Sequence, residues 1–228
     1  MINRISKAKS DKTSPKASQP SAPSRENSPK TSAATRQLEQ LRAGDWAVRS
    51  AAALELGKLG DRQATSALSA ALRDPSAEVA RSAAVALGAL RDVSAVDALT
   101  AVVLNSDGYF HSTVRIAAAE ALAALRDRRA VVALIASVRD QIAEVSQASI
   151  ETLGALGDER AIDSLVAVVR NDQNYFLSFV RQSAVEALSR LSIPSARESL
   201  RHIAADTYLD SSVRQAASKA VAVANSIN

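Results

Sequence analysis

Apolar residues recur along the chain at steps of four, four and three residues, the spacing of one face of an α-helix. Six segments within residues 47–226 share this pattern, and in each a valine precedes a reference position. The reference residues are Arg49, Ala80, Arg115, Ser146, Arg181 and Arg214. The apolar positions fall one residue before the reference and three, seven and ten residues after it, as in Val48, Ala52, Leu56 and Leu59. The pattern predicts six amphipathic helices, here called the B helices.

A second periodic segment lies between consecutive B helices, for example Ala64, Leu68 and Leu72. These segments predict A helices, the first of which begins near Ala33. Because the reference residues are 31 to 35 residues apart, A and B helices alternate along the chain. The sequence therefore predicts an all-α protein, an α-solenoid of about six antiparallel helix pairs spanning residues 33–228.

Aspartates mark the points where a B helix ends and the next A helix begins. They lie twelve residues after a reference position and are Asp61, Asp92, Asp127 and Asp158. We expect them to be N-caps, because a carboxylate accepts hydrogen bonds from the unpaired N–H groups of a first helical turn. Gly60 and Gly157 precede two of them and are expected to end helices in the left-handed conformation.

Composition narrows the class of protein further. Seven glycines and seven aromatics among 228 residues are too few for a β-sandwich or barrel. No apolar run approaches the length of a membrane-spanning helix, so no membrane span is expected. The absence of cysteine excludes disulfides and a thiolate nucleophile, and favours a reducing, cytoplasmic location.

Charge is concentrated at the N-terminus. Residues 1–32 carry seven basic and two acidic residues, together with eight serines and four prolines, whereas residues 33–228 carry 21 basic and 22 acidic residues. Such a segment has too little apolar surface to offset the entropy of folding, so residues 1–32 are expected to be a disordered tail. The tail is either a basic arm for acidic lipid, nucleic acid or acidic protein, a phosphorylation site at Ser14 or Ser28, or a solubilising leader.

Catalytic signals are absent from the sequence. It has two histidines, His111 and His202, and contains none of the nucleophile-elbow, P-loop, dinucleotide-binding or zinc-protease motifs. We therefore expect no catalytic residue, no metal site and no cofactor, and the protein is predicted not to be an enzyme.

The unit Val48–Asp61 reads Val-Arg-x-x-Ala-Ala-x-x-Leu-Gly-x-Leu-Gly-Asp, and the other five segments repeat parts of it. This unit resembles HEAT repeats, and most closely the phycobilisome-lyase HEAT-like subtype, over about residues 35–226. That family includes scaffolds, chromophore lyase subunits, DNA glycosylases and a di-iron hydroxylase. The hydroxylases hold their irons with several His-Glu pairs, which this chain lacks.

The resemblance also implies a structural ladder, because the repeat arginine of HEAT proteins usually bonds to an aspartate of a neighbouring repeat. The implied arginines are Arg49, Arg115, Arg181 and Arg214, and the implied partners are Asp61, Asp92, Asp127 and Asp158. Ala80 and Ser146 replace the arginine in two repeats, so alternate rungs are expected to be missing.

Two surfaces remain as candidate partner-binding sites. The predicted turns Asn105–His111 and Asn171–Ser178 lie 66 residues apart and share the pattern Asn-x-x-x-Tyr-Phe, which suggests a doubled repeat. Their aromatic residues, Tyr109, Phe110, Tyr175 and Phe176, either form a docking edge or fill gaps in the core.

The second surface is the outer face of the B helices, one and five residues after the reference. It carries Gln147 and Gln182 at the first position, and Leu54, Val85, Glu120, Glu151, Glu186 and Lys219 at the second. In HEAT solenoids this face lines the concave groove, so the resemblance implies a partner-binding groove. The alternative is an ordinary solvated face.

The sequence favours a non-catalytic protein–protein interaction scaffold or adaptor with a protein partner. The alternative, from the subtype resemblance, is a phycobilin lyase or a lyase accessory subunit. Nucleic-acid binding is the third alternative. The glutamates and the net charge of the solenoid disfavour binding of nucleic acid by the solenoid, whereas the basic tail has a charge suited to it. The sequence carries no signal for an oligomeric state.

Overall fold

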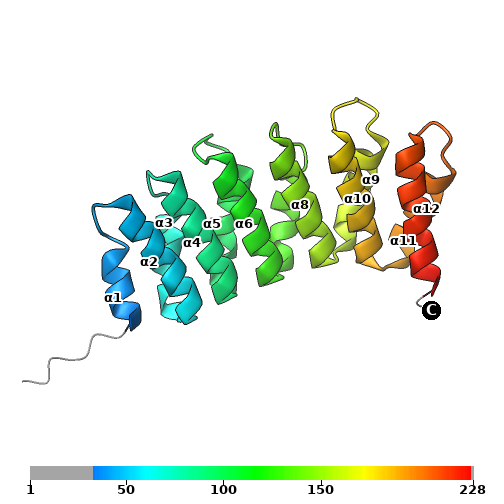
Figure 1. Cartoon of the computed structure of the whole chain (residues 1–228). Coiled ribbons are helices and arrows are strands. Elements are labelled where there is room, and N and C mark those ends of the chain that lie inside the picture. Colours follow the sequence, from blue (N-terminus) through cyan, green and yellow to red (C-terminus); the bar gives the residue numbers. More distant parts are fainter. Residues whose placement is uncertain (1–32, 227–228) are drawn as a thin grey trace, which may run out of the picture. The chain divides into compact units, whose positions relative to one another are not determined.

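The computed structural model describes residues 33–226, and within them all helices and turns follow the alternating A and B order (Figure 1). The predicted tail, with Ser14 and Ser28, lies outside the described residues. The A helices are α1 (Ala33–Gln40), α3 (Thr65–Ala71), α5 (Val96–Leu104), α7 (Val131–Ser137), α9 (Ile162–Arg170) and α11 (Pro194–Ala205). The B helices are α2 (Trp46–Leu59), α4 (Ala77–Leu90), α6 (Ser112–Leu125), α8 (Ala143–Leu156), α10 (Ser178–Leu191) and α12 (Ser211–Ser226). The predicted α-solenoid of six helix pairs is confirmed over this range.

The helices form two layers. Each A helix packs against the B helix of its own pair, and α2, α4, α6, α8, α10 and α12 pack side by side in chain order (Figure 1). The core lies between the layers, and its largest fully buried side chains are mostly leucines, such as Leu56, Leu87, Leu122 and Leu153. Each of these leucines stands seven residues after a reference position, as the periodicity predicts.

The predicted apolar stripe is buried in the inner repeats but not throughout the first one. In α4, Val79 and Leu90 are 0% and 4% exposed. Their counterparts in α2, Val48 and Leu59, are 38% and 45% exposed. This part of the prediction is wrong, because within residues 33–226 no B helix precedes α2 to cover the two ends of its apolar stripe.

Four short 3₁₀ helices precede α3, α5, α7 and α9: η1 (Arg62–Ala64), η2 (Val93–Ala95), η3 (Arg128–Ala130) and η4 (Glu159–Ala161). Each begins at a predicted capping aspartate, whose carboxylate accepts a backbone N–H bond of 2.9 to 3.1 Å; the aspartates are Asp61, Asp92, Asp127 and Asp158. Gly60 and Gly157 adopt φ values of 71° and 67°, so the predicted left-handed helix ends are also confirmed.

Small residues bring neighbouring B helices close together. A Cβ atom added at Gly57 would lie 2.8 Å from the Cα of Ala86, and one added at Gly154 would lie 2.8 Å from the Cα of Ala187. Glycine at these two positions therefore allows the contacts of α2 with α4 and of α8 with α10.

Candidate partner-binding surfaces

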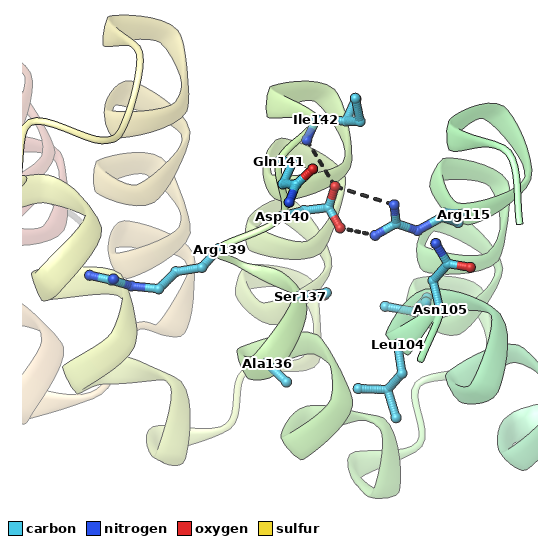
Figure 2. A pocket seen from close by; sticks show the side chains of 10 residues that line it. Leu104, Asn105, Arg115, Ala136, Ser137, Arg139, Asp140, Gln141 and Ile142 are labelled. Atoms are coloured by element: carbon cyan, nitrogen blue, oxygen red, sulfur yellow. Dashed lines mark hydrogen bonds and ion pairs between the residues drawn. The ribbon is translucent and has the colours of Figure 1, made fainter. Parts of the chain in front are cut away.

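The repeat arginines pair with aspartates in the turn that joins the A and B helices of the next repeat. Arg49 donates from Nε and Nη2 to the two carboxylate oxygens of Asp74, at 2.7 and 2.8 Å. Arg115 pairs through Nη1 and Nη2 with both carboxylate oxygens of Asp140 (Figure 2), and Arg181 pairs through Nη1 with Asp210. The side chains of the first two pairs are about nine-tenths buried, for both the arginine and the aspartate. The pairs Arg49–Asp74 and Arg115–Asp140 are therefore part of the packing between repeats.

The partners differ from those implied by the family resemblance, and this part of the expectation is wrong. Asp61, Asp92, Asp127 and Asp158 cap helices and do not pair with Arg49, Arg115, Arg181 or Arg214 in the described residues. Each reference arginine lies in the first turn of a B helix, whereas these aspartates follow the far end of such a helix, roughly 20 Å away for 14 residues. Arg214 donates from Nε to the carbonyl oxygen of Leu209 in its own turn, at 3.2 Å.

Alternate repeats lack the arginine–aspartate pair, as expected, and a tyrosine hydroxyl makes the contact between repeats there. Ala80 and Ser146 carry no guanidinium. In their place, the hydroxyl of Tyr109 donates to the carbonyl oxygen of Arg73 at 3.1 Å, and that of Tyr175 donates to the carbonyl oxygen of Asp140 at 2.9 Å. The turns at Asp74 and Asp140 are therefore each held by an arginine of the preceding repeat and a tyrosine of the following one.

A cleft of about 370 Å³ opens beside the Arg115–Asp140 pair (Figure 2). Burial lowers the pKa of Arg115 from its ordinary value. Its Nε makes no hydrogen bond, whereas the equivalent Nε of Arg181 donates to the carbonyl oxygen of Val169 at 2.9 Å. Arg139 also lines the cleft. Because Arg115 and Asp140 neutralise each other, this pair serves packing and is not a free acid or base.

The aromatic turns divide into a buried and an exposed ring. Phe110 and Phe176 are 7% and 8% exposed and belong to the core, so a docking role is wrong for these two residues. Tyr109 and Tyr175 are 48% and 46% exposed. Each tyrosine packs edge-on against the neighbouring phenylalanine, with ring centroids 5.2 and 5.0 Å apart. The outer faces of the tyrosines remain available at this edge.

The outer face of the B helices presents one exposed side chain per helix over most of the array. Glu120 on α6, Glu151 on α8 and Glu186 on α10 are exposed at equivalent positions. The preceding helices carry apolar residues there: Val85 is 40% exposed and Leu54 is half-buried, while Lys219 is exposed on α12. At the position five residues after the reference, the side chains therefore change from apolar to acidic along α2 to α10.

Local contacts neutralise this acidic row only in part. Gln147 is half-buried and donates from Nε2 to Oε1 of Glu151 at 2.8 Å. Arg190 lies 3.7 Å from Glu186 on the same helix, and Gln182 is exposed beside it. A cleft of about 410 Å³ between α10 and α12 adjoins the end of the row and includes Glu186 and Lys219 in its wall.

Each of the two histidines makes a local hydrogen-bond contact within its own helix or turn. His111 accepts a hydrogen bond at Nδ1 from the backbone N–H of Thr113 and caps α6. His202 is exposed, with Nε2 2.8 Å from Oε1 of Glu198. No group of three His, Asp or Glu side chains that could hold a metal ion occurs within residues 33–226. In the same range, no helix combines the length and apolar character needed to cross a membrane.

The sequence interpretation missed Asp74, Asp140 and Asp210 as ladder partners. A signal for two of them exists in the sequence, because the dipeptides Arg73-Asp74 and Arg139-Asp140 recur 66 residues apart, like the Tyr-Phe dipeptides. The recurrence of this Arg-Asp dipeptide every 66 residues identifies the two turns that the repeat arginines and the turn tyrosines contact.

A family model of HEAT repeats matches residues 35–111 and 109–178. These segments cover more than half of the chain, which therefore belongs to the HEAT-repeat family. Among curated proteins, none matches the chain significantly.

Solved structures agree with this assignment. The chain is 28% identical to a chain in the complex of CpcE and CpcF of phycocyanin lyase from Nostoc sp. PCC7120, with a TM-score of 0.60, covering 85% of this chain and 77% of that chain. Two engineered proteins are 21% and 22% identical, with TM-scores of 0.51 and 0.54, covering 85% of this chain and 96% and 99% of theirs. The engineered proteins support the fold alone.

Proposed function

We propose that this HEAT-repeat protein is a non-catalytic scaffold that binds a protein partner through the outer face of its B helices. The observation that carries this proposal is the row of exposed glutamates, Glu120, Glu151 and Glu186, on three consecutive packed helices. Since neighbouring helix axes lie about 8–10 Å apart, the row extends over roughly 20 Å. Aligned like charges repel one another and add nothing to packing, so a complementary partner is the favoured explanation.

The chemistry of this face selects a basic segment as the partner. Three carboxylates in a row attract Lys and Arg side chains, and the amides of Gln147 and Gln182 offer additional donors and acceptors beside them. The exposed apolar side chain of Val85 precedes the row and would contact an apolar residue of the same segment. Tyr109, with an exposed outer ring face, provides further contact area at the turn edge.

The test is charge reversal of the row. A partner is first isolated by affinity capture from native lysate and then produced as a pure protein. Glu120→Lys, Glu151→Lys and Glu186→Lys together should slow association and remove its salt dependence, because exposed charges act mainly on the association rate.

The matched control reverses the same number of exposed glutamates in the A layer, Glu39→Lys, Glu159→Lys and Glu198→Lys. This control has the same net charge and should associate nearly as the parent does. If both triple variants associate alike, the row is not the binding surface and the proposal fails.

A second candidate function is that of a phycobilin lyase subunit or accessory protein. The similarity to the phycocyanin lyase complex, at 28% identity over 85% of this chain, favours it. The pure protein is mixed with a free bilin, with and without an apo-phycobiliprotein subunit, and visible absorbance is followed. A protein-dependent spectral change supports this function, and an unchanged bilin spectrum in both mixtures opposes it.

A further inference from the structure

The doubled repeat places two copies of the same turn edge in one chain. Helices α4 and α8 begin 66 residues apart, as do α6 and α10, and all four contain 14 residues. Both copies keep the Arg-Asp dipeptide of one turn and the Tyr-Phe dipeptide of the next. Because the two copies have the same fold, a residue that differs between them is not required by the fold at that position.

Three polar residues of the first copy are large apolar residues in the second. Ser76 corresponds to Ile142, His111 to Leu177 and Thr113 to Phe179. The apolar replacements are not buried: Ile142, Leu177 and Phe179 are 42%, 57% and 38% exposed. Tyr175 lies in the same turn, and the ring of Tyr208 in the following turn is 99% exposed.

The second copy also loses a helix cap through this change. His111 accepts the backbone N–H bond of Thr113 at the start of α6, whereas Leu177 makes no side-chain cap at the start of α10. Loss of an N-cap bond destabilises the start of a helix. Since the first copy shows that polar residues satisfy the fold at these positions, the exposed apolar side chains are best explained by an interface.

A small cleft lies between the two turns of the second copy. It has a volume of about 260 Å³ and lies between Asp140 and Gln141 on one side and Tyr175 and Leu177 on the other. Small-molecule sites usually have volumes of about 300–1,000 Å³, so the cleft is better suited to an inserted side chain. Figure 2 shows Gln141 and Ile142 beside Asp140 in the first of these two turns.

The charges around this edge are balanced. Arg139 and Arg170 are exposed there together with Glu144 and Asp172, while Asp140 is already paired with Arg115. An edge that carries equal numbers of exposed basic and acidic groups around an apolar centre is complementary to itself across a two-fold axis, where each sign can meet its opposite.

We infer that the turn edge formed by Ile142, Tyr175, Leu177 and Phe179 is a homodimer interface, whose occupant is a second copy of this chain. Such a dimer leaves the outer faces of the B helices in both copies free for the partner proposed above. The inference is independent of that binding function.

The test measures the oligomeric state by sedimentation velocity over a range of concentrations. The parent is expected to be a dimer. The variant Ile142→Ser, Leu177→His and Phe179→Thr, which installs the residues of the first copy, should weaken the dimer about tenfold or more. Its helical circular dichroism and melting temperature should match or exceed those of the parent, which keeps loss of folding from imitating loss of the dimer.

The control variant changes three other exposed apolar residues, Leu59→Ser, Val93→Thr and Val132→Thr, and should remain dimeric. A parent that is monomeric at every concentration overturns the inference, as does a first-copy variant that dimerises like the parent. The lysine variant of the glutamate row separates the two proposals, because it should lose partner binding and remain a dimer.

The absence of cysteine allows a second, geometric measurement. Leu177→Cys and Val132→Cys each give one site for a spin label. The label at position 177 should give a shorter distance between copies than the label at position 132. The reverse order would place the interface elsewhere and contradict the inference.

Discussion

Arg115 on α6 and Asp140 in the turn before α8 form an ion pair whose side chains are only 9% and 11% exposed. Asp140 also accepts the backbone N–H bond of Ile142 at 2.9 Å, so one carboxylate fixes the turn and holds the neighbouring repeat. Arg49 and Asp74 repeat this arrangement, with the N–H of Ser76 bonded at 2.8 Å.

The first prediction follows from this pair. Arg115→Ala should lower the free energy of unfolding by about 3–5 kcal/mol, because it leaves a largely buried carboxylate without its counter-charge. The measurement is urea denaturation followed by circular dichroism. Arg128→Ala is the control: Arg128 is 71% exposed and its Nε is 3.8 Å from Asp158. That change should cost less than about 1 kcal/mol, and equal losses in the two variants would contradict the ladder.

The second prediction concerns the tyrosines that replace the missing rungs. Tyr175→Phe removes the hydroxyl that bonds to the carbonyl oxygens of Arg139 and Asp140, at 3.1 and 2.9 Å. We expect a loss of about 0.5–1.5 kcal/mol, the usual net value of one hydrogen bond. Tyr208→Phe, at a ring 99% exposed, should leave the melting temperature unchanged. Melting curves that shift equally for both variants would rule out a structural role for the Tyr175 hydroxyl.

Much of the fold is predictable from the sequence because it depends on local periodicity. The leucines at the centre of each B helix, such as Leu122 and Leu153, are fully buried at the predicted positions. The capping role of Asp61 is equally local, since the carboxylate and the N–H that it accepts are two residues apart. Such features need no knowledge of how repeats are stacked.

The ladder partners and the aromatic rings depend on packing between repeats. Arg49 contacts Asp74 and not Asp61, because the start of its B helix lies against the A–B turn of the next repeat. This placement depends on how the repeats are stacked. The Tyr-Phe turns are compatible with either exposure or burial in the sequence. Folding of the turn against the preceding repeat then buries Phe176 while the ring of Tyr175 stays half-exposed.

The third prediction concerns the close approach of α8 and α10. Gly154→Ala should destabilise the protein, because the new Cβ would lie 2.8 Å from the Cα of Ala187 and the helices must move apart. Overpacking of this kind typically costs about 1–3 kcal/mol. Gly44→Ala is the control, since an added Cβ there meets nothing within 4 Å. Thermal unfolding of both variants checks this, and a stable Gly154→Ala protein would show that the helix contact adapts.

The last prediction concerns acid unfolding. The hydrogen bond from the Arg160 guanidinium lowers the pKa of Asp158 from its ordinary value of 3.8 to about 2. The hydrogen bond from Arg49 likewise lowers the pKa of Asp74. A depressed carboxyl pKa means that the unfolded chain binds the proton more readily, so these groups stabilise the folded state above pH 4 and lose that contribution as the pH falls towards 2.

Titration of these two carboxyl groups should therefore lower the free energy of unfolding as the pH falls from 4 to 2. Above pH 4 the same groups should change it little. Asp158→Asn removes one of the titrating carboxylates, so its stability should fall less steeply with acid than that of the parent. Urea denaturation at a series of pH values measures both slopes. Identical slopes would mean that the proton affinity of Asp158 does not differ between the folded and unfolded chains, contrary to its bond with Arg160.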